Sequence, residues 1–163
     1  MLQSLDSRLL HAMRTRFHNP AAEAVGKALG KLGEYGAVWF VIGVAMAFID
    51  PDHGDDWLVA GFLGPVAIGL NFVVKLIVRR PRPVLEGLPP IGGAPSNLSF
   101  PSAHATASFA CATAMTRIAP EAAFLFILAA GIAACRPYLG MHYPSDVLAG
   151  AILGTALGLV VPL

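Results

Sequence analysis

The 163 residues are 56% hydrophobic and 13% charged, with a mean hydropathy of +0.66 and a formal net charge of +1. Soluble globular domains carry about a quarter charged residues, so this composition excludes an ordinary soluble domain and predicts one membrane-embedded domain over residues 1–163. A net charge near zero without a long basic run also excludes nucleic acid as a partner.

Residues 2–18 predict an amphipathic helix that lies in the membrane interface. Arginines occupy one face, and charges within the first sixteen positions interrupt any apolar core, so we do not expect a cleaved signal peptide. Asn19-Pro20 ends the helix. The apolar residues at helical spacing are Leu2, Leu5, Leu9, Ala12, Met13 and Phe17.

Five apolar segments follow and predict an all-α, polytopic membrane bundle with about five transmembrane helices. The first covers 35–49, which the stretch 20–33 can extend backwards, and the second, 57–78, is long enough to cross roughly 30 Å of hydrocarbon. The others cover 102–118, 121–134 and 144–161. We expect Asn71 to hydrogen-bond inside the bundle, and Cys111 and Cys135 to be free thiols within apolar segments.

Small residues recur at every fourth position of the last segment, at Gly150, Gly154 and Gly158. This spacing lets membrane helices approach closely. It is explained either by packing within the chain or by a homo-oligomer interface, and packing within the chain is the preferred interpretation.

The connections between segments differ in character. DPDHGDD at 50–56 predicts a solvated turn rather than a cation site, because it lacks the glycine and glutamate spacing of an EF-hand. The Pro/Gly-rich stretch 81–101 is long enough to be a lid or a substrate entry. Alternating the segments across the membrane puts this stretch, the N-terminal helix and the 136–144 loop on one side.

Three polar clusters lie on that side: KLIVRRPRP, PSAH and CRPYLGMHYPSD. Arginine offers a planar fork and lysine a point charge to phosphate oxygens. With Ser102 as N-cap, the helix beginning there directs the N–H groups of Ala103 and His104 at an anion. The clusters therefore predict an oxyanion site, while Arg79 and Arg80 are interpreted as interfacial anchors.

The clusters resemble the three signature motifs of the type 2 phosphatidic acid phosphatase superfamily, Lys-x6-Arg-Pro, Pro-Ser-Gly-His and Ser-Arg-x5-His-x3-Asp. Two positions differ: Ala103 replaces glycine but keeps its N–H, and Cys135 replaces a serine, which removes one hydroxyl. The resemblance implies a lipid phosphatase. The clusters contain too few carboxylates for a two-metal site, so we expect no metal and no cofactor. The matching positions are Lys75, Arg82, Pro83, Pro101, Ser102, His104, Arg136, His142 and Asp146.

The resemblance also implies a role for each residue. His142 would attack phosphorus, Asp146 would orient the ring of His142, and His104 would protonate the leaving alcohol and later activate water. The phosphate would be bound by Lys75, Arg82, Ser102, Ala103 and Arg136.

Within this superfamily, the chain is most similar to short actinobacterial members that act on decaprenylphosphoryl-5-phosphoribose 5-phosphate. The shared features are the run SFPSAHAT, a GE pair before the first membrane segment and the ending HYPSD. The alternative substrates are phosphatidylglycerol phosphate and a polyprenyl diphosphate. An intramembrane serine protease is disfavoured, because Ser102 and His104 point in different directions on a helix. A haloperoxidase-type site is disfavoured because such relatives are larger and soluble. A non-catalytic bundle would not need ionisable groups at membrane depth.

The basic residues also predict an orientation in a bacterial inner membrane. The positive-inside rule places the side that carries most of them in the cytoplasm. Only Arg117 lies on the opposite side, against Arg8, Arg14, Arg16, Lys27, Lys31, Arg79 and Arg80 on the active-site side.

Overall fold

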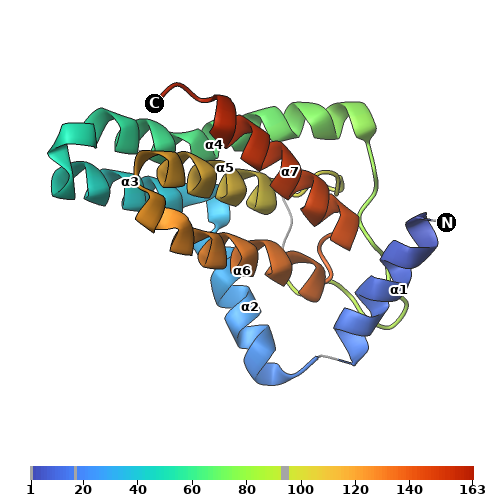
Figure 1. Cartoon of the computed structure of the whole chain (residues 1–163). Coiled ribbons are helices and arrows are strands. Elements are labelled where there is room, and N and C mark those ends of the chain that lie inside the picture. The colour runs from blue at the N-terminus through green and yellow to red at the C-terminus, as the bar shows by residue number, and fades with distance from the viewer. Residues whose placement is uncertain (1, 17, 93–95) are drawn as a thin grey trace.

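Helices make up most of the chain in the computed structural model, which describes residues 2–16, 18–92 and 96–163 (Figure 1). Within these residues the only β feature is an isolated bridge between Pro81 and Leu98. The all-helical expectation is confirmed. The helices are α1 (Leu2–Thr15), α2 (Pro20–Leu32), α3 (Ala37–Ile49), α4 (Gly54–Val78), α5 (Ala103–Ile118), α6 (Leu125–Tyr138) and α7 (Pro144–Val160).

The capacity to cross a membrane differs between these helices. By length and apolar composition, Pro51–Val78 and Pro120–Tyr138 can each span a bilayer, and α2 with α3 is a third span if the pair, bent by 47°, counts as one. Large apolar side chains such as Phe62, Val73 and Ile77 are exposed along α4 and form a lipid-compatible surface. The number of five crossings stays a prediction.

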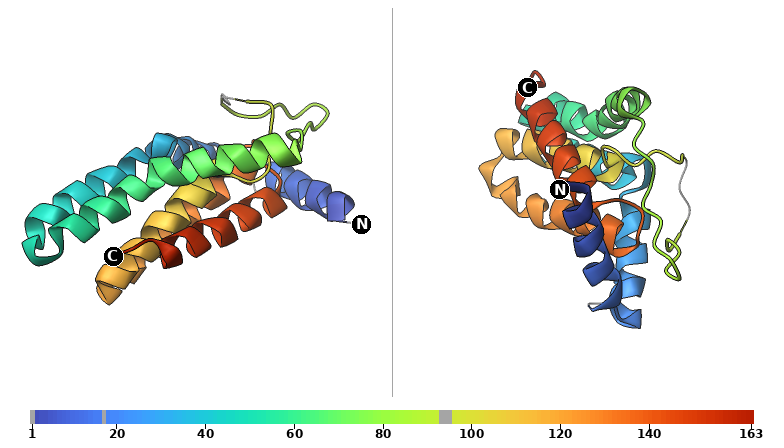
Figure 2. Two further views of the ribbon diagram at one scale, coloured as in Figure 1. Left: turned by 90° about the horizontal axis from the view of Figure 1, so that it is seen from above. Right: turned by 90° about the vertical axis from the view of Figure 1, so that its right-hand side faces the viewer.

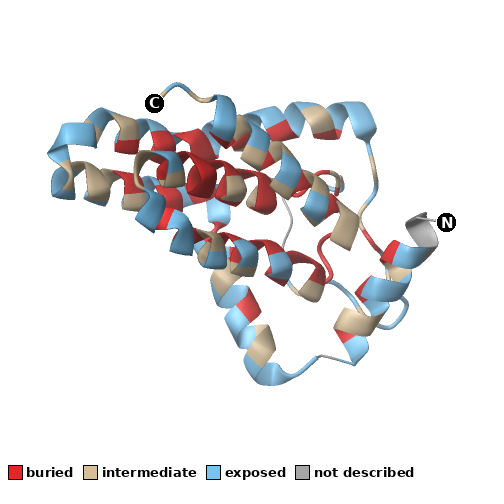
Figure 3. Cartoon of the chain, in the orientation of Figure 1, coloured by how far each residue is buried: buried red, intermediate tan, exposed pale blue. Residues whose placement is uncertain are grey.

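Helix α5 lies at the centre of the bundle, and it is the most completely buried helix in Figure 3. Ten of its sixteen residues are buried, and apart from Met115 all ten are alanine, serine, threonine or cysteine. Short side chains let α4, α6 and α7 pack close to the α5 backbone. Asn71 of α4 donates to Thr106 Oγ1 of α5 at 2.9 Å, which confirms the predicted buried hydrogen bond.

The glycine stripe of α7 packs against α5 within the same chain. A Cβ atom at Gly150 would lie 2.6 Å from the carbonyl oxygen of Ser102, and one at Gly158 would lie 2.5 Å from that of Ala110. A Cβ atom at Gly154 would collide with the carbonyl oxygen of Thr106. Packing within the chain is therefore confirmed as the use of this stripe, and a homo-oligomer stays a prediction without support from it.

Two helix boundaries differ from the expected segments. The first apolar segment is broken between α2 and α3, where Tyr35 has φ 55° and Gly36 has φ 74°. Helix α6 continues to Tyr138, so Arg136, which was expected in a loop, lies on a helix. The break includes Gly36, whose positive φ costs a glycine little, and Pro137 lies inside the last turn of α6 instead of ending the helix before Arg136.

Helix α1 contacts the protein through a face that the sequence pattern did not indicate. Asp6, Leu10 and Arg14, spaced four residues apart, are buried, whereas Leu5 and Leu9 are exposed. Arg14 was expected on the polar, outward face and instead donates to the carbonyl oxygen of Pro89 at 2.7 Å. Phe17, also assigned to the apolar face, lies outside the described residues.

The two ends of the bundle carry different groups, as Figures 1 and 2 show. Helix α1, the described parts of the connection between α4 and α5 (79–92 and 96–102), and the turn between α6 and α7 gather at one end. The acidic turn, with Asp52 and Asp55 exposed, lies at the other end, where Arg117 donates to the carbonyl oxygen of Gly158. Of the two alternatives for DPDHGDD, the exposed turn agrees with the structure.

Gly154→Ala should destabilise the protein, because the added methyl group meets the α5 backbone, which has no side chain to move aside. We expect a loss of about 1–3 kcal/mol in the free energy of unfolding. Gly69→Ala in α4 is the matched control, since nothing lies within 4 Å of its Cβ position, and it should change stability by no more than about 1 kcal/mol. Denaturant unfolding in detergent measures both, and equal effects would contradict the packing.

Candidate active site

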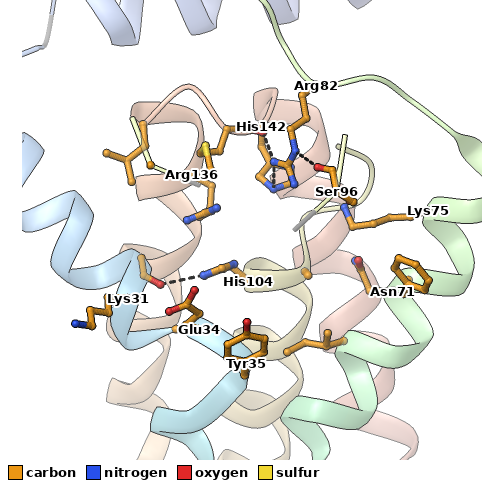
Figure 4. Close-up of a pocket in the computed structure, with 18 of the residues that line it drawn as sticks. Lys31, Glu34, Tyr35, Asn71, Lys75, Arg82, Ser96, His104, Arg136 and His142 are labelled. Carbon is orange, nitrogen blue, oxygen red and sulfur yellow. Dashed lines mark hydrogen bonds between the residues drawn. The ribbon is translucent and has the colours of Figure 1, made fainter. Parts of the chain in front are cut away.

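A cavity of about 670 Å³ lies at the end of the bundle where α4 ends and α5 begins (Figure 4). Ser102 and Asp146, both expected in the site, are fully buried behind its wall. The other expected site residues all line the cavity: Lys75, Arg82, Ala103, His104, Arg136 and His142.

His142 presents one ring nitrogen to Arg82. The Nη1 group of Arg82 lies 3.3 Å from Nε2 of His142 and also donates to the carbonyl oxygen of Met141 at 2.6 Å. Because a guanidinium can only donate, Nε2 is the accepting nitrogen and the proton of the neutral ring lies on Nδ1. Burial lowers the pKa of His142 to about 4, so the imidazole is neutral near pH 7 and Nε2 keeps its lone pair.

Asp146 faces the other nitrogen of the same ring. Its Oδ2 atom lies 3.6 Å from Nδ1 of His142, which is longer than a hydrogen bond, and Nδ1 has no other partner. Oδ2 also accepts from the N–H of Tyr143 at 2.8 Å, as part of the capping of α7. The predicted pairing of the two residues is therefore present as a close approach, and a small movement of the ring would close the hydrogen bond.

Arg80 holds Asp146 from behind. Its Nη1 atom donates to Oδ1 of Asp146 at 2.8 Å, and its Nη2 atom donates to Asp6 of α1, also at 2.8 Å. The guanidinium carbon lies 4.1 Å from the centre of the Tyr143 ring. The interpretation of Arg80 as a membrane anchor was wrong, because one planar fork binds two buried carboxylates at once.

Asp6 completes this network. Burial alone would raise the pKa of its carboxyl group, but hydrogen bonds from Arg80 and Ser145 more than offset that effect and lower the pKa below its ordinary value. Asp6 also accepts from the backbone N–H of Ser145 at 3.0 Å. Helix α1 is thereby tied to the first turn of α7, directly beside Asp146.

Lys75 connects the end of α4 to the segment before α5. Its ammonium group donates to the carbonyl oxygens of Leu98, Ser99 and Pro101, at 3.3, 3.2 and 2.8 Å. Carbonyl oxygens solvate the ammonium without cancelling its charge. Lys75 therefore remains a cation in the cavity wall.

The start of α5 differs in one respect from the expectation. Ser102 stands at the N-cap position, but its hydroxyl makes no capping bond and is buried without a partner. The N–H of Ser102 instead donates to the carbonyl oxygen of Asp146 at 2.9 Å. His104 lies in the first turn, where its Nε2 atom is 3.0 Å from the carbonyl oxygen of Gly30 at the end of α2.

Arg136 reaches the cavity from α6 and is largely buried, with no hydrogen-bond partner for its Nε atom. Cys135, which stands in the expected serine position, donates instead to the carbonyl oxygen of Ile132. Both cysteines are free thiols, as predicted. Across the described residues, no three His, Cys, Asp or Glu side chains gather as they would around a metal ion.

The comparison with known proteins agrees with this arrangement. Residues 57–163, which include every residue of the three polar clusters, match the PAP2 superfamily. The chain belongs to the PAP2 superfamily. It is 37% identical over 142 residues to the decaprenylphosphoryl-5-phosphoribose phosphatase of Mycobacterium tuberculosis, which covers 87% of this chain and 80% of that protein.

Two further PAP2 relatives come from Bacillus subtilis. An undecaprenyl-diphosphatase is 30% identical over 105 residues, covering 62% of this chain and 53% of that protein. The crystal structure of a transmembrane PAP2-type phosphatidylglycerolphosphate phosphatase superposes with a TM-score of 0.73 at 26% identity, covering 98% of this chain and 83% of that chain. The protein is thus a membrane-located PAP2 lipid phosphatase, and the predicted family, fold class and enzyme class are confirmed.

Part of this PAP2 site was not found from the sequence. Gly33, Glu34 and Tyr35, at the break between α2 and α3, line the cavity together with the phosphate-binding candidates. The GE pair was noticed only as a point of resemblance. Asp6 and Arg80 were missed because a charged residue on an amphipathic helix, or at a helix end, is normally at the surface.

Replacing Arg80 by Gln should lower kcat by about a hundredfold while KM changes little, because Arg80 positions Asp146 without lining the cavity. Arg79→Gln is the matched control. Among the described residues, the Arg79 side chain binds the carbonyl oxygen of Leu76 alone, so this variant should retain full activity. Steady-state kinetics on a lipid phosphate separates the two constants. A rise in KM with unchanged kcat would show that Arg80 binds substrate instead.

Proposed function

We propose that this PAP2 phosphatase hydrolyses a lipid-borne phosphomonoester through a phosphohistidine formed at His142. The observation that carries the proposal is the position of His142 Nε2, which lies in the cavity wall beside Arg82. The unprotonated Nε2 is the nucleophile, and the three cations of the wall, Lys75, Arg82 and Arg136, neutralise the phosphate dianion.

In the first step the lone pair of Nε2 attacks phosphorus, and a P–N bond forms as the P–O bond to the lipid breaks. Nδ1–H of His142 tightens onto Asp146 as the ring becomes positively charged, which favours the transition state. His104 enters this step with a proton on each ring nitrogen, a charge that the bound phosphate dianion stabilises. Its Nε2–H stays donated to Gly30, and the departing oxygen takes the proton from Nδ1, which leaves the ring neutral. The N–H groups in the first turn of α5, including that of Ala103, donate hydrogen bonds to the phosphoryl oxygens.

In the second step neutral His104 takes a proton from water while the water oxygen attacks phosphorus. The P–N bond breaks, Nε2 recovers its lone pair, and inorganic phosphate leaves. The buried Ser102 hydroxyl, which has no partner among the described residues, is available to the phosphate after a rotation about χ1. No step uses a metal ion, so activity should survive EDTA.

The substrate proposed is decaprenylphosphoryl-5-phosphoribose, because the relative that matches 80% of its own length bears this name. Phosphatidylglycerolphosphate is the second candidate, supported by the structural likeness over 98% of this chain. The diphosphate candidate has weaker support, since that relative is matched over 53% of its length. A panel of the three lipids with purified protein compares them directly.

We also propose that the active-site end faces the cytoplasm of a bacterial inner membrane. Basic residues support this orientation, because Lys27, Lys31, Arg79 and Arg80 lie near that end and Arg117 lies at the other. Substrates made inside the cell, such as a phosphorylated sugar lipid, fit this orientation.

His142→Ala should reduce phosphate release in EDTA by at least about a thousandfold, because no other group in the wall replaces the nucleophile. His53→Ala, at the opposite end of the molecule, is the control.

His104→Ala should accumulate phosphohistidine with p-nitrophenyl phosphate. The leaving group of this substrate needs no proton, but hydrolysis of the intermediate needs a base. Substantial turnover by His142→Ala, or activity that requires Mg²⁺, would disprove the mechanism.

A cysteine at residue 86 should resist an impermeant maleimide in intact cells, whereas one at residue 52 should react, if the active-site end is cytoplasmic. Glu86 and Asp52 are both exposed, at opposite ends, and the native Cys111 and Cys135 are buried. In the variants Glu86→Cys and Asp52→Cys, labelling therefore reports on the introduced cysteine without a background signal from the native thiols. Labelling of residue 86 from outside would reverse the proposed orientation.

A further inference from the structure

The break between α2 and α3 places a carboxylate in a cavity that is otherwise rich in cations. Glu34 is the only acidic residue among the described residues that line the cavity. It is solvent-exposed at the cavity surface, and its carboxylate forms no hydrogen bond or ion pair with the described part of the protein. The cations of the same wall are Lys27, Lys31, Lys75, Arg82 and Arg136.

The backbone around Glu34 is held by close packing. A Cβ atom at Gly33 would lie 2.5 Å from Ile132 of α6 and 3.0 Å from the ring of His104. Gly36 has a positive φ and packs on the backbone of Gly64 in α4, 3.3 Å from its Cβ position. Contacts on both sides of Glu34 therefore fix where its side chain leaves the backbone.

Glu34 lies on the leaving-group side of the reaction. In Figure 4, His104 lies between the pair Arg82 and His142 on one side and the pair Glu34 and Tyr35 on the other. A phosphoryl group held at His142 gives up its ester oxygen toward His104. The alcohol attached to that oxygen then extends toward Glu34 and Tyr35, which line the same cavity.

The charge of Glu34 restricts what this alcohol can be. A carboxylate repels a second anionic group placed beside it, and it accepts strong hydrogen bonds from neutral hydroxyl groups. A polyprenyl diphosphate would put its remaining phosphate, which is attached directly to the ester oxygen, next to Glu34. In a phosphoribose lipid or a phosphatidylglycerolphosphate, the sugar or the glycerol separates the ester oxygen from the second phosphate, and hydroxyl groups lie next to Glu34 instead.

We propose that Glu34, with the Tyr35 hydroxyl beside it, is a subsite for the hydroxyl groups of the leaving alcohol. It selects lipid phosphates whose ester oxygen is attached to a polyhydroxylated unit. The inference rests on the proposed phosphatase mechanism and deepens it, because it separates the substrate candidates by a single side chain.

The test compares kcat/KM for two soluble, short-chain prenylphosphoryl-5-phosphoriboses, one with both ring hydroxyls and one with neither. The unmodified protein should prefer the hydroxylated lipid by about tenfold or more. Glu34→Gln should reduce this preference to about twofold or less. Glu121→Gln, the same charge change at the opposite end of the molecule, should keep the full preference.

Farnesyl diphosphate provides a second arm, in which Glu34→Gln should raise kcat/KM or leave it unchanged. If Glu34→Gln lost kcat/KM equally on all lipids, Glu34 would only balance the charge of Arg136. That result would overturn the subsite. A preference that persists in Glu34→Gln would overturn it too. If the unmodified protein released phosphate from neither phosphoribose lipid, the proposed substrate would fail together with this inference.

Discussion

The backbone N–H of Ser102, immediately before α5, donates to the carbonyl oxygen of Asp146 in the first turn of α7, at 2.9 Å. This bond requires the two helix starts to lie almost in contact, which only the glycine stripe of α7 allows. With larger residues at Gly150 and Gly154, α7 would move away and take His142 and Asp146 with it. The site depends on this close approach, because the nucleophile and the anion-binding helix start belong to different helices.

Two cations of the site, Lys75 and Arg82, are solvated by backbone carbonyl oxygens. Lys75 binds three carbonyl oxygens and Arg82 binds two, without a carboxylate at hydrogen-bond distance from either. Dipoles fixed by the fold stabilise a desolvated cation and leave its net charge for a phosphate. The carboxylates Asp6 and Asp146 are kept behind the cavity wall, where Arg80 pairs with both.

The first part of the chain completes a site whose reacting groups come from the second part. Helix α2 fixes the ring of His104 through Gly30, and the break after α2 brings Glu34 to the same cavity. Helix α1 reaches Asp146 indirectly, through Asp6 and Arg80. The PAP2 match covers residues 57–163, so it includes the catalytic groups and Arg80 but not Asp6, Gly30 or Glu34.

The sequence by itself determined the membrane class, the helical segments and six cavity residues, because hydropathy and the three clusters are local patterns. It also predicted the Asn71 hydrogen bond and the packing of the glycine stripe. It did not reveal the burial of Asp6 and Arg14, the bridge made by Arg80, or the cavity position of Glu34. Those depend on contacts between segments far apart in the chain. The sequence does not show whether a charged side chain faces water or pairs with a distant residue. Asp6 and Arg80 are 74 residues apart, and only the tertiary structure brings them together.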